Sequence, residues 1–307
     1  MRRIVGIVFA GLGVLLVVAR FVVPGGKPLL GTGIFAIFIG GIVFGLSFIR
    51  SSEAAADAPP PLSPGERILG IFYEPARVFQ NLRHYPRWFA AFLVIAVFAG
   101  IYQVAFTQRL GGEQIATAEI DKVIESGWIP ADKQAEVRQQ AIDEARSPVG
   151  RVVKPLSQAG VIFLFMLVLA GLYLLLVMIF GGRLYFLQAL SVATYASLPT
   201  IVIQNVLGLI LLYIKSPDDI DPIKGQRGLV HADLSLLFSP ADHIYLYAIG
   251  GTIGIFTLYG LWLLTTGLRN TGEKVSAGTA WGIGLTVWFI GLLFVLGAAA
   301  LFPSFVR

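Results

Sequence analysis

The amino-acid sequence predicts an all-α integral membrane protein, a polytopic helical bundle of about seven spans. The first observation is composition: 56% of the 307 residues are hydrophobic, 13% are charged, and the mean hydropathy is +0.78. Globular domains carry about 25% charged residues, so a soluble chain this apolar could not cover its own surface. The second is length, because a helix needs roughly 20 apolar residues to cross a bilayer. Seven stretches meet that length: 4–23, 29–49, 87–107, 156–180, 185–214, 243–267 and 276–301.

The same composition excludes several kinds of chemistry. The chain has no cysteine, which excludes disulfides, thiolate metal sites and cysteine nucleophiles. Its histidines (His84, His231 and His243) offer no pair at the i, i+4 spacing of a shared metal site. The net charge of +5 comes from basic residues that flank apolar stretches and form no stripe for nucleic acid. We therefore expect no catalytic residue, no metal, no cofactor and no nucleic-acid partner.

The first two stretches form a predicted two-span hairpin over residues 1–50, joined by the turn PGGKP. The first is expected to be a retained span, since it is long and VVARFVVPGG offers no A-x-A cleavage site. With the N-terminus in the cytoplasm, the cytoplasmic segments hold ten basic residues against five acidic ones. Short loops rich in Lys and Arg stay inside, so the sequence predicts a cytoplasmic N-terminus and an external C-terminus.

An Ala/Pro-rich linker, residues 51–65, separates the hairpin from a five-span body over 66–303. Its PPP run favours an extended, stiff conformation. The linker ends in Ser63-Pro64-Gly65-Glu66, which has the spacing of a capping box with proline at the first helical position. A helix is therefore expected to begin there.

Residues 66–85 are predicted to form an amphipathic helix in the headgroup plane, restarted at Pro75 and ended by Pro86. Val78, Phe79, Leu82 and Tyr85 share its apolar face, and Arg77, Gln80, Asn81, Arg83 and His84 take the other. Two readings stay open: a plain elbow that leads into the next span, or a docking surface for anionic lipid or a partner protein. The residues expected to make the lipid or partner contact are Arg77, Phe79, Arg83, Arg87 and Trp88.

The only sizeable polar segment, residues 113–147, is predicted to be an amphipathic helical hairpin outside the membrane. Ala116, Ile120 and Val123 share a helical face, Trp128-Ile129-Pro130 breaks the chain, and a second helix follows. It is expected to cap the body, with a ligand-capturing lid as the alternative.

The fifth stretch carries the most polar side chains of any span. Two interpretations stay open: these side chains form hydrogen bonds between spans, or they line a polar pathway or a headgroup pocket. Pro199 frees a backbone carbonyl near Tyr195, which neighbouring helices must satisfy. Gln188 and Tyr195 are seven residues apart and so share a face. The candidate residues are Gln188, Thr194, Tyr195, Pro199, Gln204 and Asn205.

Ser239-Pro240-Ala241-Asp242 precedes the sixth stretch, next to His243. Contiguous residues on one helical turn cannot form a Ser-His-Asp triad, because their side chains diverge. The spacing instead predicts a helix cap, with Ser239 as the cap, Pro240 at the first position and Asp242 at the third. Glycines four apart, such as Gly250 and Gly254, favour close helix contact within the chain or between copies.

The body resembles the Yip-domain family in its prokaryotic form. The motifs that carry the resemblance are ILGIFYEPARVFQNLRHYPRW, PADKQAEVRQQAIDEARSP, GGRLYFLQALSVATYASLPTIVIQNVL and LLFSPADHIYLYAIGGTIGIF, within roughly residues 66–303. The resemblance implies a five-span integral protein, here of a prokaryotic inner membrane. Eukaryotic members are related to Ypt/Rab-interacting proteins and bind small GTPases. Here their long polar N-terminal region is replaced by two spans and a short linker, so GTPase binding is not transferable.

These observations favour a non-enzymatic scaffold or organiser whose partners are membrane lipids, other membrane proteins or a second copy of itself. The alternative is a transporter or lipid-translocating protein that uses the polar, kinked fifth span. That alternative requires a hydrated cavity lined by Gln188, Tyr195 and Gln204.

Overall fold

The computed structural model describes residues 2–22, 27–49 and 58–303, and over these ranges it is all-α, with two isolated β-bridges and no strand. The predicted fold class is confirmed. Five helices are long and apolar enough to cross a membrane, and a shorter apolar helix covers Ile4–Ala19. The long ones are Leu29–Leu46, Phe89–Leu110, Ser157–Ile179, Phe186–Ile214 and Ala277–Leu301.

The chain divides into two compact units, described separately below. The first comprises the described parts of 1–50, 96–164 and 205–229, and the second those of 51–95, 165–204 and 230–307. Three long helices contribute residues to both units: α5 (Phe89–Leu110), α8 (Pro148–Ile179) and α9 (Phe186–Ile214).

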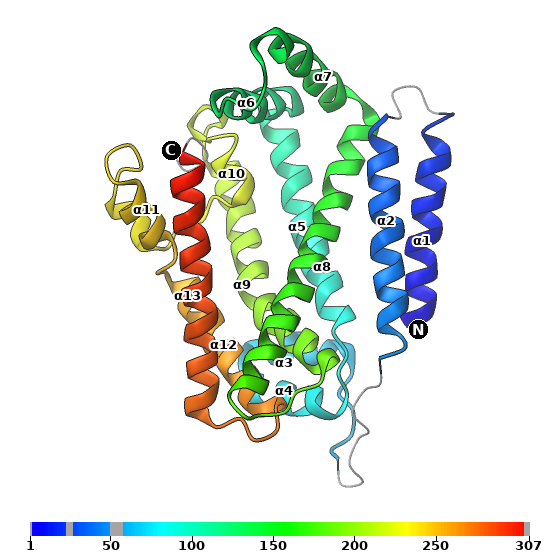
Figure 1. Cartoon of the computed structure of the whole chain (residues 1–307), viewed down its shortest axis with the longest axis vertical. Helices are drawn as coiled ribbons and strands as arrows, with labels where there is room; N and C mark the ends of the chain where they lie inside the picture. The colour runs from blue at the N-terminus through cyan, green and yellow to red at the C-terminus, as the bar shows by residue number, and fades with distance from the viewer. Residues whose placement is uncertain (1, 23–26, 50–57, 304–307) are drawn as a thin grey trace. The chain divides into compact units, whose positions relative to one another are not determined.

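In the first unit, α1 (Arg2–Ala19) and α2 (Lys27–Leu46) lie side by side (Figure 1). Gly6 permits this close packing, because any other residue would place a Cβ only 2.6 Å from the Phe44 nitrogen, where the two atoms would clash. Residues 24–26 of the predicted turn, and 51–57 of the predicted linker, lie outside the described residues.

The polar insertion in the same unit folds as the predicted helical hairpin. It consists of α6 (Gly112–Glu125), the 3₁₀ turn η1 (Ala131–Lys133) and α7 (Gln134–Arg146). Ion pairs join α6 to α7, Arg146 with Glu113 at 2.8 Å and Arg138 with Asp121. Below it, Tyr102 packs in a buried cluster with Phe106 and donates a hydrogen bond to the Gly225 carbonyl at 2.6 Å. The short elements η2 (Pro217–Asp219) and α10 (Lys224–Arg227) follow α9.

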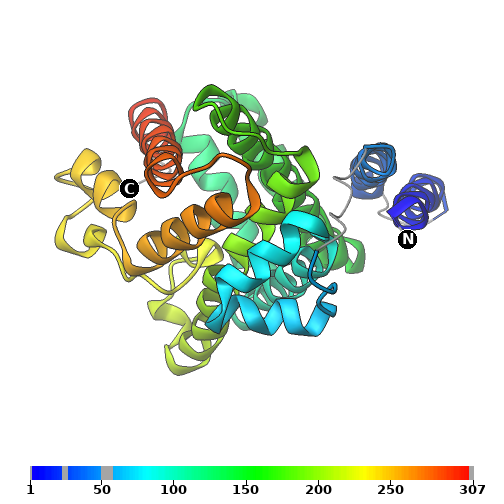
Figure 2. The same cartoon turned by 90° about the horizontal axis from the view of Figure 1, so that it is seen from below.

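The second unit begins with α3 (Pro64–Tyr73) and α4 (Pro75–His84), which lie across the end of the unit beside α12 (Figure 2). The predicted capping box is present, because Glu66 N donates to the Ser63 hydroxyl at 3.2 Å and Ser63 N donates to the Glu66 carboxylate at 2.7 Å. That second hydrogen bond holds the pKa of the Glu66 carboxyl below its ordinary value. Pro75 restarts the helix as predicted.

The predicted sixth span, 243–267, is not one helix but two, α11 (Ile244–Gly251) and α12 (Ile255–Thr271). Between them the backbone pairs with residues 232–234, which lead into η3 (Leu234–Leu237). Leu234 N donates to the Ile253 carbonyl at 3.0 Å, and Ile255 N donates to the Ala232 carbonyl at 3.1 Å. Gly254 permits this approach, since a Cβ there would lie 2.7 Å from the Ala232 oxygen. A non-local pairing thus replaces the helical hydrogen bonds that the apolar sequence predicted.

The predicted cap before that span is also wrong. Residues 239–242 form a turn closed by His243 N donating to the Ser239 carbonyl at 2.9 Å. The helix α11 begins only at Ile244, its N-cap is His243, and no side chain caps it. Neither Ser239, Pro240 nor Asp242 therefore holds the helical position that the spacing suggested. The last helix, α13 (Ala277–Leu301), does have a serine cap, because Ser276 accepts from Thr279 N at 3.1 Å.

Candidate functional site

Two neighbourhoods of the second unit carry the polar chemistry: the α3–α4 elbow, meaning residues 64–88, and a cavity beside the helix break. At the elbow, Arg67 is only 1% exposed. Its Nε donates to the Leu62 carbonyl at 3.0 Å, and its Nη2 donates to the same oxygen. Burial lowers the pKa of Arg67 from its ordinary value, and the nearby Tyr195 hydroxyl opposes that shift. An arginine remains protonated even so, and the elbow therefore encloses a positive charge.

Polar side chains of α9 hold the elbow in place. Gln188 donates to the Arg83 carbonyl at 2.7 Å and accepts from Tyr185 N at 2.9 Å. Tyr195, fully buried, faces the Arg67 guanidinium, although no donor–acceptor pair there has the geometry of a full hydrogen bond. Gln188 and Tyr195 thus share a face, as their spacing predicts, and that face meets the elbow.

The other polar residues of α9 do not join this group. Thr194 donates to its own helix, at the Leu190 carbonyl, with a distance of 2.6 Å. Pro199 is buried and α9 continues through it, while Gln204 and Asn205 are half-buried farther along the helix. The six candidates thus lie at different places along α9, and their use as a polar pathway stays a prediction.

The inner face of the elbow packs on protein. Phe79 has no exposed surface; its ring lies against Gly267 of α12, and its carbonyl accepts from the Thr271 hydroxyl at 3.2 Å. Trp88 is 2% exposed and packs edge-to-face on Phe89, with ring centroids 5.6 Å apart. These two side chains, expected to contact lipid or a partner, are instead interior. Asn81, expected on the polar face, is buried too, and its side-chain amide donates to the Pro60 carbonyl at 3.0 Å.

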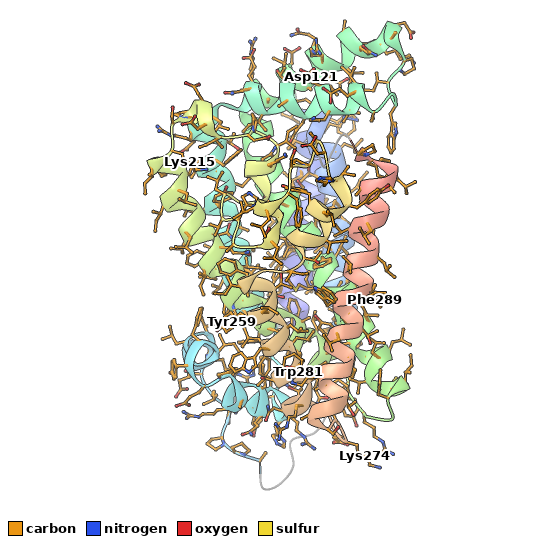
Figure 3. All side chains as sticks on the ribbon, turned by 90° about the vertical axis from the view of Figure 1, so that its left-hand side faces the viewer. Asp121, Lys215, Tyr259, Lys274, Trp281 and Phe289 are labelled. Carbon is orange, nitrogen blue, oxygen red and sulfur yellow. The ribbon has the colours of Figure 1, made fainter. Side chains whose placement is uncertain are left out.

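The exposed side chains of the elbow, here called its outer face, include basic and apolar residues. Arg77 is 64% exposed and pairs with Glu74 at 2.9 Å, and Arg83 is 41% exposed and lies 3.7 Å from Glu273. Arg87 is exposed as well. Figure 3 shows Lys274 at this end of the unit, with Trp281 and then Phe289 farther along α13. Three large apolar side chains are exposed on α3: Leu69, Phe72 and Tyr73.

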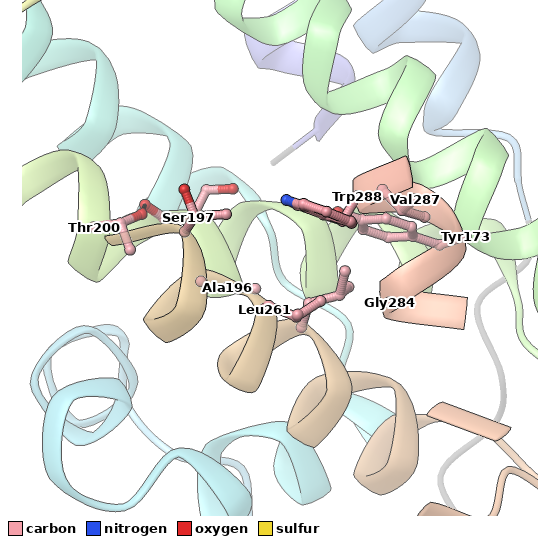
Figure 4. A pocket seen from close by; sticks show the side chains of 11 residues that line it. Tyr173, Ala196, Ser197, Thr200, Leu261, Gly284, Val287 and Trp288 are labelled. Carbon is pink, nitrogen blue, oxygen red and sulfur yellow. Dashed lines mark hydrogen bonds between the residues drawn. The ribbon is translucent and has the colours of Figure 1, made fainter. Parts of the chain in front are cut away.

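The second neighbourhood is a cavity of about 200 Å³ lined by residues of α8, α9, α12 and α13. Figure 4 shows Ser197 and Thr200 on one side of it and Trp288 and Val287 on the other, with the Trp288 indole nitrogen turned toward the Ser197 side. The side chains that give it polarity and shape are Tyr173 from α8, Ser197 and Thr200 from α9, Thr257 and Leu261 from α12, and Trp288 from α13.

The cavity lies at the level of the helix break. Trp288 donates from Nε1 to the carbonyl of Thr252, the first residue after α11, at 3.0 Å. Counting from Ala277, Trp288 is the twelfth of the 25 residues of α13, so the break lies beside the middle of a membrane-crossing helix. Irregular backbone at that depth is stable only where its polar groups find partners, and Trp288 supplies one.

The cavity is not the one that the sequence predicted. Gln188, Tyr195 and Gln204 do not line it; neighbouring residues on other faces of α9 do. Tyr173, Thr257 and Trp288 were missed altogether. The sequence gives only a weak signal for these residues. A single hydroxyl or indole group in an apolar span can be assigned to a site only when it is known which helices face one another.

The long apolar helices and the buried polar contacts between them define a polytopic helical integral membrane protein. Its family follows from comparison with known proteins. The family model of the Yip1 domain matches residues 69–299, and the chain belongs to this family, as its motifs indicated. The match begins within α3 and ends within α13, so it leaves out α1 and α2. No curated protein and no solved structure matches the chain.

Proposed function

We propose that this Yip-domain protein is a non-enzymatic membrane organiser that binds the headgroups of anionic lipids at the outer face of its elbow. The observation that carries the proposal is the exposure of Arg77, Arg83 and Arg87 on an elbow that also exposes the apolar side chains Leu69 and Phe72 of α3. A helix with apolar side chains facing the acyl region and arginines near it is suited to the membrane interface. Each basic residue near an anionic leaflet contributes about 1 kcal/mol.

The elbow lies on the cytoplasmic side of a prokaryotic inner membrane in this proposal, as the distribution of basic residues between the loops favours. Phe79 and Trp88 have a supporting role, because their burial fixes the elbow on the membrane-spanning helices. The fixed elbow presents its arginines without the entropy loss of ordering a mobile segment. Arg67 is enclosed and does not contact lipid.

The test is a charge reversal of two elbow arginines, Arg77→Glu with Arg83→Glu. We expect the double variant to retain several-fold less phosphatidylglycerol than the wild type, relative to phosphatidylcholine, when both are extracted from mixed nanodiscs. Native mass spectrometry of the bound lipid measures the ratio. The loss of two exposed ion pairs costs the fold little, since such pairs are worth about 0–1 kcal/mol each.

The matched control is Arg138→Glu with Arg146→Glu, which removes two ion pairs between α6 and α7. This control should keep the wild-type lipid ratio. An equal loss in both double variants would mean that the lipid responds only to net charge, and the elbow would lose its assigned role.

A transporter or lipid-translocating protein is the second candidate. The break between α11 and α12, beside a cavity at the middle of α13, favours it, because transporter sites are commonly built at broken helices near the bilayer midplane. Proteoliposomes with a fluorescent phospholipid separate the two candidates. An organiser leaves the transbilayer exchange of that lipid at the protein-free rate, whereas a translocating protein accelerates it.

A further inference from the structure

We propose that the cavity between α8, α9, α12 and α13 binds an uncharged lipophile that carries one carbonyl or hydroxyl oxygen on a long hydrocarbon chain. This site uses none of the elbow residues, so it stands independently of the proposed function. Three properties of the cavity lead to that ligand class: its charge, its free hydroxyl groups, and its depth and size.

The cavity is lined without a charge. None of its 11 lining residues is an aspartate, glutamate, lysine, arginine or histidine. A charged group that enters a site at membrane depth needs an opposite charge, since its desolvation is otherwise uncompensated. The lining therefore selects against phosphate, carboxylate and ammonium groups, and in favour of a neutral ligand.

The lining nevertheless offers hydrogen bonds. Thr200 donates to the Ser197 carbonyl at 2.9 Å, and Trp288 donates to the Thr252 carbonyl at 3.0 Å. The hydroxyls of Tyr173, Ser197 and Thr257 make no such bond with any described residue, although Tyr173 is only 5% exposed. Ser197 and Thr257 are half-buried. Each of the three hydroxyls can donate one hydrogen bond and accept others, so together they can bind an oxygen supplied from outside the chain.

Depth and size complete the assignment. The site lies beside the middle of α13, where the surrounding solvent is hydrocarbon, and Leu261, Leu264 and Val287 give it apolar walls. Its volume of about 200 Å³ is below the roughly 300–1,000 Å³ of sites that enclose a whole small molecule. It therefore holds the oxygen-bearing part of a lipophile whose remaining chain extends into the bilayer.

The probe for this site is a long-chain fatty alcohol with a diazirine and a terminal alkyne, added to the full-length protein in nanodiscs. After irradiation, we expect saturable labelling on peptides that contain Ser197, Thr257 or Trp288. Unlabelled 1-hexadecanol should abolish it, and hexadecane at the same concentration should compete at least several-fold less well. Labelling that rises without saturation on all lipid-facing helices would overturn the proposal.

Two variants test the cavity itself. Gly260→Leu fills it, and its first carbon is tolerated because a Cβ there would lie 3.6 Å from the Thr200 methyl group. The matched control is Gly171→Leu, on α8, where a Cβ would meet no atom within 4 Å. We expect roughly tenfold less saturable labelling in Gly260→Leu and the wild-type level in Gly171→Leu. Equal labelling in the two variants would contradict the assignment.

A further double variant separates hydrogen bonding from shape, and it tests the proposal even if Gly260→Leu does not fold. Ser197→Ala with Thr257→Val keeps the volume and removes two of the three free hydroxyls. In this variant hexadecane should compete as well as 1-hexadecanol does. A preference for the alcohol that survives unchanged would overturn the role of the hydroxyls. Fast oxidation of Trp288 by hydroxyl radicals in lipid-saturated samples would show water in the cavity and equally overturn the proposal.

Discussion

At the scale of single residues, Arg67 explains how the elbow is attached. Burying a positive charge to 1% exposure destabilises the fold unless its N–H groups form hydrogen bonds. Two N–H groups of this guanidinium donate to the Leu62 carbonyl. The charge also lies against Tyr195 in the fifth span. Arg67 thereby joins the segment that precedes α3 to the membrane-spanning part of the second unit.

Replacing Arg67 tests this role. Arg67→Met removes the charge and leaves the Leu62 carbonyl without its partner, so we expect a loss of about 2–4 kcal/mol in stability. Arg67→Lys keeps the charge but not the planar fork, and should lose about half as much. Tryptophan fluorescence during heating in detergent measures both. An Arg67→Met protein that melts within 1 °C of wild type would show that the buried charge is not structural.

At the scale of elements, the break between α11 and α12 is the feature that departs most from a simple bundle. Its cause is a match between two segments: Gly250 and Gly254 leave room for the backbone of residues 232–235, and two hydrogen bonds close the contact. A helix of 8 residues and one of 17 replace a single span. The irregular backbone then lies beside Trp288, where the cavity forms.

A substitution at Gly254 tests whether this backbone pairing requires a residue without a Cβ atom. In Gly254→Ala the new methyl group would lie 2.7 Å from the Ala232 carbonyl, so the two segments must separate. Gly251→Ala is the control, since its nearest neighbour would be 4.0 Å away. We expect faster amide exchange at residues 232–237 in Gly254→Ala alone. Equal exchange rates in the two variants would mean that the break does not rest on this contact.

At the scale of the whole molecule, the sequence predicts which loops face the cytoplasm, and the lack of cysteine makes that prediction easy to test. Ala76→Cys, in α4, should react from the cytoplasmic side with a membrane-impermeant maleimide. Asp132→Cys, in η1, should react only from the opposite side. Both should label once the membrane is dissolved. Labelling of both from one side in intact vesicles would rule out the predicted orientation.

Two local signals in the sequence predicted local structure correctly, whereas the cap predicted at Ser239 did not form. The Ser63 and Glu66 capping box and the restart at Pro75 depend on residues within one helical turn, and both are present. The burial of Phe79 shows the limit of such signals. Its position on an apolar face predicts that it avoids water, but lipid and a neighbouring helix satisfy that pattern equally well, and here the neighbour is α12.

The sequence by itself determined the membrane class, the positions of most spans, the helical polar insertion and the family. These follow from composition, hydrophobic length and motifs, which are properties of contiguous residues. Only the tertiary structure decided that the sixth stretch is broken, that Phe79 and Trp88 are interior, and that the cavity is lined by Ser197, Thr257 and Trp288. The physical reason is that each of these depends on contacts between segments distant in the chain. Ala232 and Gly254, for example, lie too far apart in sequence for any local pattern to pair them.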